Sequence, residues 1–246
     1  MSAPLFLFSG VGSDCRMFTP VIDRLKDDFA IVPWDMPGYG GKPLDDGFTF
    51  AGMADAVVED MNRAGIARAV FLGHSIGGML AQEIAARHPG RVAALILSGT
   101  TPVFGSPDGE FQKQFLAARL APLDQGVTMP ELAQSFAKDL LGSNPDPEAG
   151  PTATTLMSEL PEQSYRAGLT CLVTFNRREE LARIAVPTLL IAGEQDTNAP
   201  LKTMQRMAEK IRGARIETLP ETGHLAPLEC PGRFAEAVRR FLNDLP

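Results

Sequence analysis

Cysteine and histidine are both scarce in this chain of 246 residues, which has three of each. The cysteines Cys15, Cys171 and Cys230 lie far apart, are odd in number, and lack the spacing of metal ligands. This usage is not that of a secreted domain held together by disulfides. We therefore expect a reducing compartment, no disulfide framework and no metal site.

The sequence also lacks a basic face and a long apolar run. The formal net charge is −7, with acidic and basic residues interspersed, which excludes an ordinary nucleic-acid-binding surface. The run Leu5–Phe8 is too short to span a bilayer, and the first residues lack the features of a signal peptide. We expect a cytoplasmic protein that binds neither nucleic acid nor membrane.

Short apolar runs alternate with amphipathic segments at both ends of the chain. The runs predict strands at 4–8, 30–34, 68–72, 92–97, 187–192 and 214–219. The amphipathic segments predict helices near 17–27, 49–64, 76–88, 200–212 and 231–243. Runs as apolar as 93–97 and 188–192 suit strands covered on both faces, which is typical of a parallel sheet with crossover helices.

The alternation breaks between residues 103 and 184. Helical patterns there cover 110–120, 129–141 and a segment from about 152, with a Pro/Gly-rich loop at 142–147. We interpret 103–184 as a helical cap insertion after the fourth strand, with 1–102 and 185–246 forming the core. Apolar residues of the insertion could line a pocket, although helix packing is the simpler role for most of them; these are Phe111, Phe115, Phe136, Met157 and Phe175.

The segment 73–78, Gly-His-Ser-Ile-Gly-Gly, is the strongest sign of chemistry in the chain. It follows the apolar run 69–72 and precedes the helical pattern 79–86. A Gly-x-Ser-x-Gly pattern between a strand and a helix places its serine on a tight turn, with the hydroxyl exposed above the sheet. A chance Ser/Gly turn is the alternative, but both flanks favour Ser75 as a nucleophile.

A serine nucleophile needs a positioned base, and histidine usually fills that role. His74 lies inside the turn, so we expect its side chain to point elsewhere and to be structural. His88 ends a helix, where a positive charge is favourable, and is interpreted as a surface cap. His224 remains: it lies in a loop after the last strand, at the sheet edge where Ser75 is expected.

The histidine in turn needs an acceptor that fixes its tautomer. Asp196, directly after the fifth strand, is the best candidate, and Glu194 is its near competitor in the same loop. A turn residue or helix cap is the alternative role for Asp196. The presence of Ser75 and His224 favours the catalytic one.

Two backbone amides should hold the oxyanion of a tetrahedral intermediate. One is that of Ile76, directly after the serine, and the other comes from loop 9–13, where we choose Val11. Gly10 in that loop lets the backbone approach a substrate closely. Arg16 could bind a substrate carboxylate, although a solvated arginine at a helix start is the simpler interpretation.

With these motifs in order, the chain resembles the α/β-hydrolase fold family. The nucleophile, acid and histidine occur in the family's order. The family's loop after the second strand matches residues 35–40, Asp-Met-Pro-Gly-Tyr-Gly. Its approach to the acid resembles residues 186–188 leading to 193–196. The likeness implies an α/β fold with a mainly parallel central sheet and flanking helices. Residues 8–9 and 16–18 carry part of a likeness to small esterases and lactonases, including enol-lactonases.

This resemblance implies a serine hydrolase that cleaves a small-molecule carboxylic ester, lactone or thioester through an acyl-serine, without metal or cofactor. The alternatives are a hydrolase of C–C bonds in vinylogous diketones and a non-catalytic member that binds small molecules. Ser9-Gly10 stands where family members often have His-Gly, and we expect the usual N-terminal antiparallel hairpin to be absent. The strand at 30–34 would then be a sheet edge, and such an edge could join two copies in a homodimer; otherwise the protein is a monomer.

Overall fold

A parallel β-sheet forms the centre of the molecule. The computed structural model describes residues 3–46, 48–106 and 108–245. In this part of the chain, six strands pair in the order β2-β1-β3-β4-β5-β6, and every neighbouring pair is parallel. The strands are β1 (Leu5–Phe8), β2 (Ile31–Pro33), β3 (Ala69–His74), β4 (Val92–Ser98), β5 (Thr188–Gly193) and β6 (Arg215–Leu219). The predicted parallel α/β fold is therefore confirmed.

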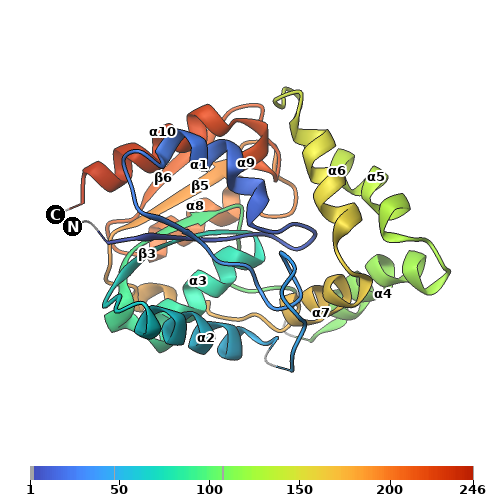
Figure 1. Ribbon diagram of the computed structural model, residues 1–246, viewed down its shortest axis with the longest axis horizontal. Helices are drawn as coiled ribbons and strands as arrows, with labels where there is room; N and C mark the ends of the chain where they lie inside the picture. Colours follow the sequence, from blue (N-terminus) through green and yellow to red (C-terminus); the bar gives the residue numbers. More distant parts are fainter. Residues whose placement is uncertain (1–2, 47, 107, 246) are drawn as a thin grey trace.

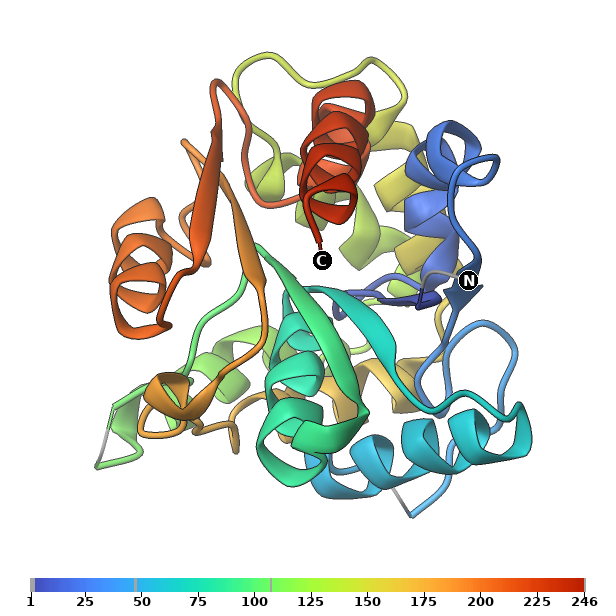
Figure 2. The ribbon, with the colours of Figure 1, turned by 90° about the vertical axis from the view of Figure 1, so that its left-hand side faces the viewer.

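Helices cover both faces of this sheet, as the apolar strands require (Figure 1). Side chains alternate along β1, so that Leu5 and Leu7 pack toward one helical layer and Phe6 and Phe8 toward the other. The first layer contains α1 (Thr19–Leu25) and α10 (Pro231–Asn243), and the second contains α2 (Phe50–Arg63), α3 (Ile76–Arg87) and α8 (Leu201–Lys210). Figure 2 shows these layers on opposite sides of the twisted sheet.

The predicted helix at 17–27 differs from the structure, which divides it in two. A 3-10 turn covers Cys15–Phe18, and α1 then begins at Thr19 and ends at Leu25. Pro20 lies in the first turn of α1, where its missing N–H costs no hydrogen bond. A short helix that the sequence pattern did not reveal, α9 (Ala226–Glu229), directly precedes α10.

Four α-helices of the described chain lie between β4 and β5, at the end of the molecule opposite both termini (Figure 1). They are α4 (Glu110–Asp124), α5 (Met129–Leu140), α6 (Ala149–Glu159) and α7 (Glu162–Leu172). We use the name cap for these four helices. Met157 and Tyr165 of the cap belong to the same apolar cluster as Phe8 and Phe71 of the sheet. The cap is thus packed onto the core, and its proposed boundaries at 103 and 184 remain a prediction.

The chain leaves the sheet for the cap and returns from it at one place. The amide of Phe104 donates to the carbonyl of Phe175 at 2.9 Å, and the amide of Arg177 donates to the carbonyl of Pro102 at 2.8 Å. The guanidinium of Arg177 also binds both carboxylate oxygens of the buried Glu83 in α3, at 2.7 and 2.8 Å. We call this group of contacts the cap junction.

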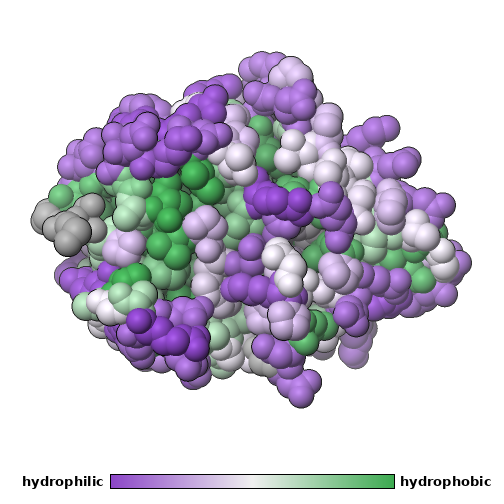
Figure 3. Space-filling model, viewed as in Figure 1, coloured by the Kyte–Doolittle hydropathy of each residue, from purple (hydrophilic) through white to green (hydrophobic). Residues whose placement is uncertain are grey.

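Strand β2 forms one edge of the sheet, as the sequence predicts. No strand lies beyond it among the described residues, so an N-terminal antiparallel hairpin is missing there. Ile31 and Val32 of β2 are only half-buried, and apolar surface gathers over this edge between polar helices (Figure 3). Pairing of two copies through β2 stays a prediction. Helices long and apolar enough to cross a membrane do not occur in the described part of the chain.

Candidate active site

Ser75 lies on a strained turn between β3 and α3. Its backbone has φ 55° and ψ −118°, a region that side-chain-bearing residues rarely adopt and that costs about 1–3 kcal/mol. The flanking glycines make the turn possible. A Cβ on Gly73 would lie 2.1 Å from the carbonyl oxygen of Gly77, and one on Gly77 would lie 2.3 Å from that of Phe8. The sequence therefore folds here only with glycine at both positions.

Two hydrogen bonds tie this turn to the end of β4. The amide of Ser75 donates to the carbonyl of Ser98 at 2.9 Å, and the hydroxyl of Thr100 donates to the carbonyl of Ser75 at 2.8 Å. The serine backbone is thus held by the neighbouring strand and by its own turn. A strained residue that is fixed from several sides in this way is typical of a functional position.

His224 and Asp196 meet at the same edge of the sheet. The imidazole Nδ1 of His224 donates to Oδ2 of Asp196 at 2.8 Å, and both side chains are buried. The other oxygen of Asp196 accepts the amides of Asn198 and Ala199 at 2.8 and 2.9 Å. Burial alone would raise the pKa of Asp196, but the neighbouring imidazole and these hydrogen bonds outweigh it and lower the pKa. The carboxylate is therefore kept ionised.

Glu194, the competing acid, faces away from this pair. Its side chain is exposed, and it accepts a hydrogen bond from the backbone amide of Glu221 at 3.1 Å. The structure thus places Asp196, and not Glu194, against the imidazole of His224.

A cavity of about 350 Å³ lies between the sheet edge and the cap, and Ser75 and His224 both line it. The Ser75 hydroxyl and the imidazole of His224, both in the described part of the chain, are not joined by a hydrogen bond. Catalytic hydrogen bonds of this kind often tighten only when a substrate is bound. The cap side of the cavity is aromatic, with Phe104, Phe111, Phe115, Phe136 and Tyr165. A largely apolar cavity with a few polar groups at one end is typical of a small-molecule site.

Helix packing was expected for most of five apolar residues in the insertion, but three of the five border the cavity. Phe111, Phe115 and Phe136 line the cavity, and the Phe111 side chain is exposed. Met157 and Phe175 are buried in the apolar core, as expected of packing residues. Helical periodicity alone cannot show which residues of an amphipathic segment border an opening.

The loop after β1 lies beside Ser75 and lines the same cavity. Val11 and Gly10 line the cavity, and the Ile76 amide directly follows Ser75. Neither the Val11 nor the Ile76 amide donates to an acceptor among the described residues. The hydroxyl of Ser9 donates to the carbonyl of Ser13 at 2.9 Å and so closes the loop. Ser9, which stands where family members often have histidine, thus supports the loop.

Arg16 lies elsewhere, and its predicted contact with substrate does not fit this placement. Its guanidinium binds Asp14 at 2.7 Å and Glu159 at 2.7 Å, and its side chain is 55% exposed. It borders a separate surface depression and is not among the residues that line the cavity of Ser75. Asp14 caps the 3-10 turn and holds the arginine two residues later, which draws it away from the cavity.

His74 was expected to point away from the site, and this was wrong. Its ring centroid lies 4.9 Å from that of His224, and its side chain lines the cavity. Nδ1 of His74 is hydrogen-bonded to the hydroxyl of Ser98 at 3.3 Å, while Nε2 has no partner among the described residues. Burial lowers the pKa of His74 to about 3, so this imidazole is neutral at physiological pH.

Glu229 in α9 holds the loop of His224, a role that sequence reasoning missed. Its carboxylate accepts the amides of Gly223 and Leu225, on either side of His224, at 2.9 and 2.8 Å. It also accepts the amide of Gly142, at the end of α5, at 2.7 Å. Burial raises the pKa of Glu229, and these hydrogen bonds partly offset that rise. One buried carboxylate thus fixes both the histidine loop and the cap.

Metal ligation and thiol chemistry have little support in the structure. Across residues 3–46, 48–106 and 108–245, no group of three His, Cys, Asp or Glu side chains is placed to hold a metal ion. Cys15, Cys171 and Cys230 are free thiols, and burial raises the pKa of each, which disfavours the reactive thiolate.

Comparison with known proteins supports this description. The model of a family described as "Alpha/beta hydrolase family" matches residues 5–237. A protein of Stutzerimonas stutzeri with the provisional name carbamate hydrolase RutD is 29% identical over 98% of this chain and 91% of its own length. The pimeloyl-[acyl-carrier protein] methyl ester esterase of Yersinia enterocolitica is 28% identical over 98% of this chain and 93% of its own. The solved enol-lactonase of Burkholderia xenovorans is 25% identical, covers 99% of this chain and 93% of that one, and has a TM-score of 0.88.

Proposed function

Because the chain belongs to the alpha/beta hydrolase family, we propose that it is a serine hydrolase that cleaves a small carboxylic ester, lactone or thioester through an acyl-serine. The observation that carries this proposal is the common cavity. A serine on a strained turn and a histidine that is hydrogen-bonded to a buried aspartate line the same apolar space. This is the arrangement that acyl transfer requires.

In the first half of the proposed reaction, the hydroxyl oxygen of Ser75 attacks the substrate carbonyl carbon. Nε2 of His224 accepts the hydroxyl proton, and Asp196 stabilises the imidazolium through the bond to Nδ1. The tetrahedral intermediate then collapses to the acyl-serine. The leaving alcohol, enol or thiol departs with the proton that His224 returns to it.

In the second half, water replaces the leaving group. His224 takes a proton from this water as its oxygen attacks the acyl carbon, and the proton then passes to the oxygen of Ser75. The carboxylic acid leaves, and the serine hydroxyl is restored. In a lactone, the leaving oxygen stays attached to the acid, so the product is a single hydroxy acid or its keto tautomer.

The amides of Val11 and Ile76 stabilise the oxyanion in both halves. Both are backbone N–H groups without an acceptor among the described residues, and Ile76 opens α3, where the helix dipole adds positive potential. One donor of this kind typically contributes about 10²–10³ in turnover. The neutral imidazole of His74 beside His224 adds no repelling charge when the imidazolium forms.

The substrate class follows from the cavity and from what similar proteins are named for. A space of about 350 Å³ suits a small acyl compound. Two of the three compared proteins are named as an enol-lactonase and a methyl ester esterase, which supports oxygen esters and lactones; the third is named for carbamate hydrolysis.

Covalent labelling tests this proposal. A fluorophosphonate probe should add to the purified protein once per chain, with the mass shift on the peptide that contains Ser75, and prior labelling should stop the release of p-nitrophenol from short acyl esters. A well-folded protein that stays unlabelled and cleaves no ester or lactone would instead indicate a member of the fold that binds small molecules without turnover.

We expect Glu229→Gln to damage both stability and turnover. The glutamine NH₂ cannot accept the hydrogen bonds that Oε2 now receives from Gly142 and Gly223. The free energy of unfolding should fall by about 2 kcal/mol. Turnover should fall by about 10²-fold, because the loop of His224 loses its anchor. Urea unfolding and ester kinetics measure the two effects.

Glu221→Gln is the matched control for this substitution. Glu221 lies three residues before His224, is exposed, and its side chain contacts only Asn144 among the described residues, at 3.5 Å. Glu221→Gln should have the wild-type free energy of unfolding and the wild-type kcat. If Glu229→Gln behaves like this control, the carboxylate has no part in holding the histidine loop.

A further inference from the structure

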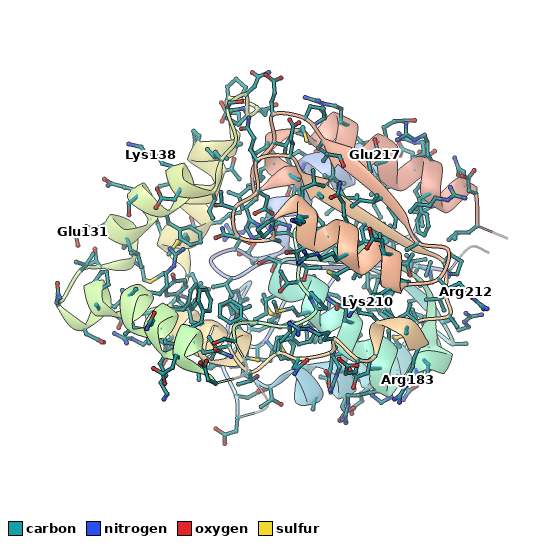
Figure 4. All side chains as sticks on the ribbon, turned by 180° about the vertical axis from the view of Figure 1, so that it is seen from behind. Glu131, Lys138, Arg183, Lys210, Arg212 and Glu217 are labelled. Carbon is teal, nitrogen blue, oxygen red and sulfur yellow. The ribbon has the colours of Figure 1, made fainter. Side chains whose placement is uncertain are left out.

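Arg119 of α4 is the one arginine, lysine, aspartate or glutamate among the described residues that line the cavity of Ser75. The rest of the cap side is aromatic or aliphatic. Other charged side chains of the cap, such as Glu131 and Lys138 of α5, project away from the body of the molecule (Figure 4). A single cation on an aromatic and aliphatic cavity wall is a specific feature, because charged side chains that serve only solubility face the solvent.

Within the described chain, the guanidinium of Arg119 has no carboxylate partner. Its central carbon lies 5.6 Å from the ring centroid of Phe115, one helical turn earlier. Arg166 of the cap, in contrast, binds both Asp124 and Glu162. The side chain of Arg119 is half-buried, so its charge is only partly hydrated. The arginine thus lies against the ring of Phe115, and its donors make no hydrogen bond with the described residues.

Tyr165 of α7 brings a second unused donor to the same wall. It is only 1% exposed and lines the cavity, yet its hydroxyl has no hydrogen-bond partner among the described residues. Its ring packs edge-on against Phe136, with centroids 6.5 Å apart. Burial raises the pKa of Tyr165, and the nearby positive charge of Arg119 opposes that rise. A hydroxyl at the cavity wall that makes no hydrogen bond with the described residues is free to donate to a bound molecule.

We propose that Arg119 and Tyr165 form an anion subsite, which selects esters or lactones that carry a carboxylate away from the reacting acyl group. The inference deepens the proposed function and rests on it. Both donors belong to the cap, whereas Ser75 and His224 belong to the sheet edge, so one substrate must span the cavity to reach both. A planar guanidinium matches a carboxylate with two parallel hydrogen bonds, and the phenol can donate a third.

Two matched pairs of esters test the subsite. The first pair is mono-p-nitrophenyl adipate and its methyl ester, in which the remote carboxylate is masked. The second is 4-acetoxybenzoate and its methyl ester, in which the carboxylate lies on the leaving group. In at least one pair, the wild type should prefer the acid in kcat/KM. Arg119→Gln should lower that acid-to-methyl-ester ratio by about 10- to 100-fold, mainly through KM.

Further variants separate the subsite from general effects of charge. Tyr165→Phe should lower the same ratio by about 2- to 10-fold. Arg119→Lys keeps the charge but not the paired donors, and should fall between the wild type and Arg119→Gln. Lys113→Gln removes a cation from the same helix at a side chain that is 74% exposed, and should leave the ratio at the wild-type value. Arg16→Gln should do the same.

Binding of adipate itself provides a test that needs no turnover. Calorimetry with Ser75→Ala should show adipate binding that is about tenfold weaker or more in the double variant with Arg119→Gln. This binding experiment tests the anion subsite even if the protein does not hydrolyse esters or lactones. Three results would each overturn the proposal. The first is that Arg119→Gln lowers kcat/KM equally for the acid and its methyl ester. The others are that Lys113→Gln lowers the acid-to-methyl-ester ratio as much as Arg119→Gln does, or that Arg119→Gln leaves the affinity for adipate unchanged.

Discussion

Ser75→Ala should lower kcat for p-nitrophenyl acetate by about 10⁴- to 10⁶-fold, the range expected when the nucleophile of a triad is removed. Alanine keeps the Cβ of serine and removes only the hydroxyl, so the turn at φ 55° is no more strained than before. The remaining activity should come from direct attack of water on the substrate, with the amides of Val11 and Ile76 stabilising the oxyanion. Steady-state release of p-nitrophenol measures the loss, and circular dichroism shows that the fold is kept.

Ser135→Ala is the matched control for this result. Ser135 lies exposed on α5 and donates to the carbonyl of Leu132 in its own helix. It should retain the wild-type rate and the fluorophosphonate label. If Ser75→Ala keeps more than about a tenth of the wild-type rate, the acyl group is not transferred to Ser75, and the proposed mechanism is wrong.

Asp196→Asn should lower kcat by about 10⁴-fold while leaving the fold intact. The amide oxygen of asparagine can still accept from Asn198 and Ala199, so the loop after β5 keeps its hydrogen bonds. The amide NH₂ would then face Nδ1 of His224 and donate to it. This forces the imidazole proton onto Nε2, the nitrogen that must accept the proton of Ser75. The tautomer is wrong although the geometry is preserved.

Glu194→Gln distinguishes this explanation from a general loss of negative charge. The substitution removes the same charge two residues earlier, from an exposed side chain that faces the backbone of Glu221. Its kcat should stay within about twofold of the wild type, since surface charges contribute little at this distance. A large loss in Glu194→Gln together with a small one in Asp196→Asn would reverse the assignment of the acid.

The sequence was sufficient to predict those features of the fold and the site that depend on local sequence patterns. Short apolar runs predicted the parallel strands, and the Gly-x-Ser-x-Gly pattern predicted the turn at Ser75. In the structure, a Cβ at Gly77 would collide with the carbonyl oxygen of Phe8. Asp196 and His224 were found because loops after parallel strands share one sheet edge. These inferences use rules that hold within a few residues or along one edge.

The features that the sequence did not reveal depend on contacts between distant segments. Glu229 accepts the amide of Gly142, 87 residues away in the chain, and no local pattern signals that contact. Arg16 and Arg119 look alike as single arginines near apolar residues. Their difference arises because Asp14 and Glu159 capture the first, and no carboxylate of the described chain meets the second.

The cap junction has a consequence for how such a chain can diversify. Because Pro102 and Phe104 are hydrogen-bonded to Arg177 and Phe175, the segment between them begins and ends at one narrow base. A foreign helical segment grafted at this base would need to match this seam, to cover the apolar surface beneath it and to offer Glu229 an amide in place of that of Gly142. Substrate specificity could therefore change by replacement of this one segment, while the strands that carry Ser75 and Asp196 keep their register.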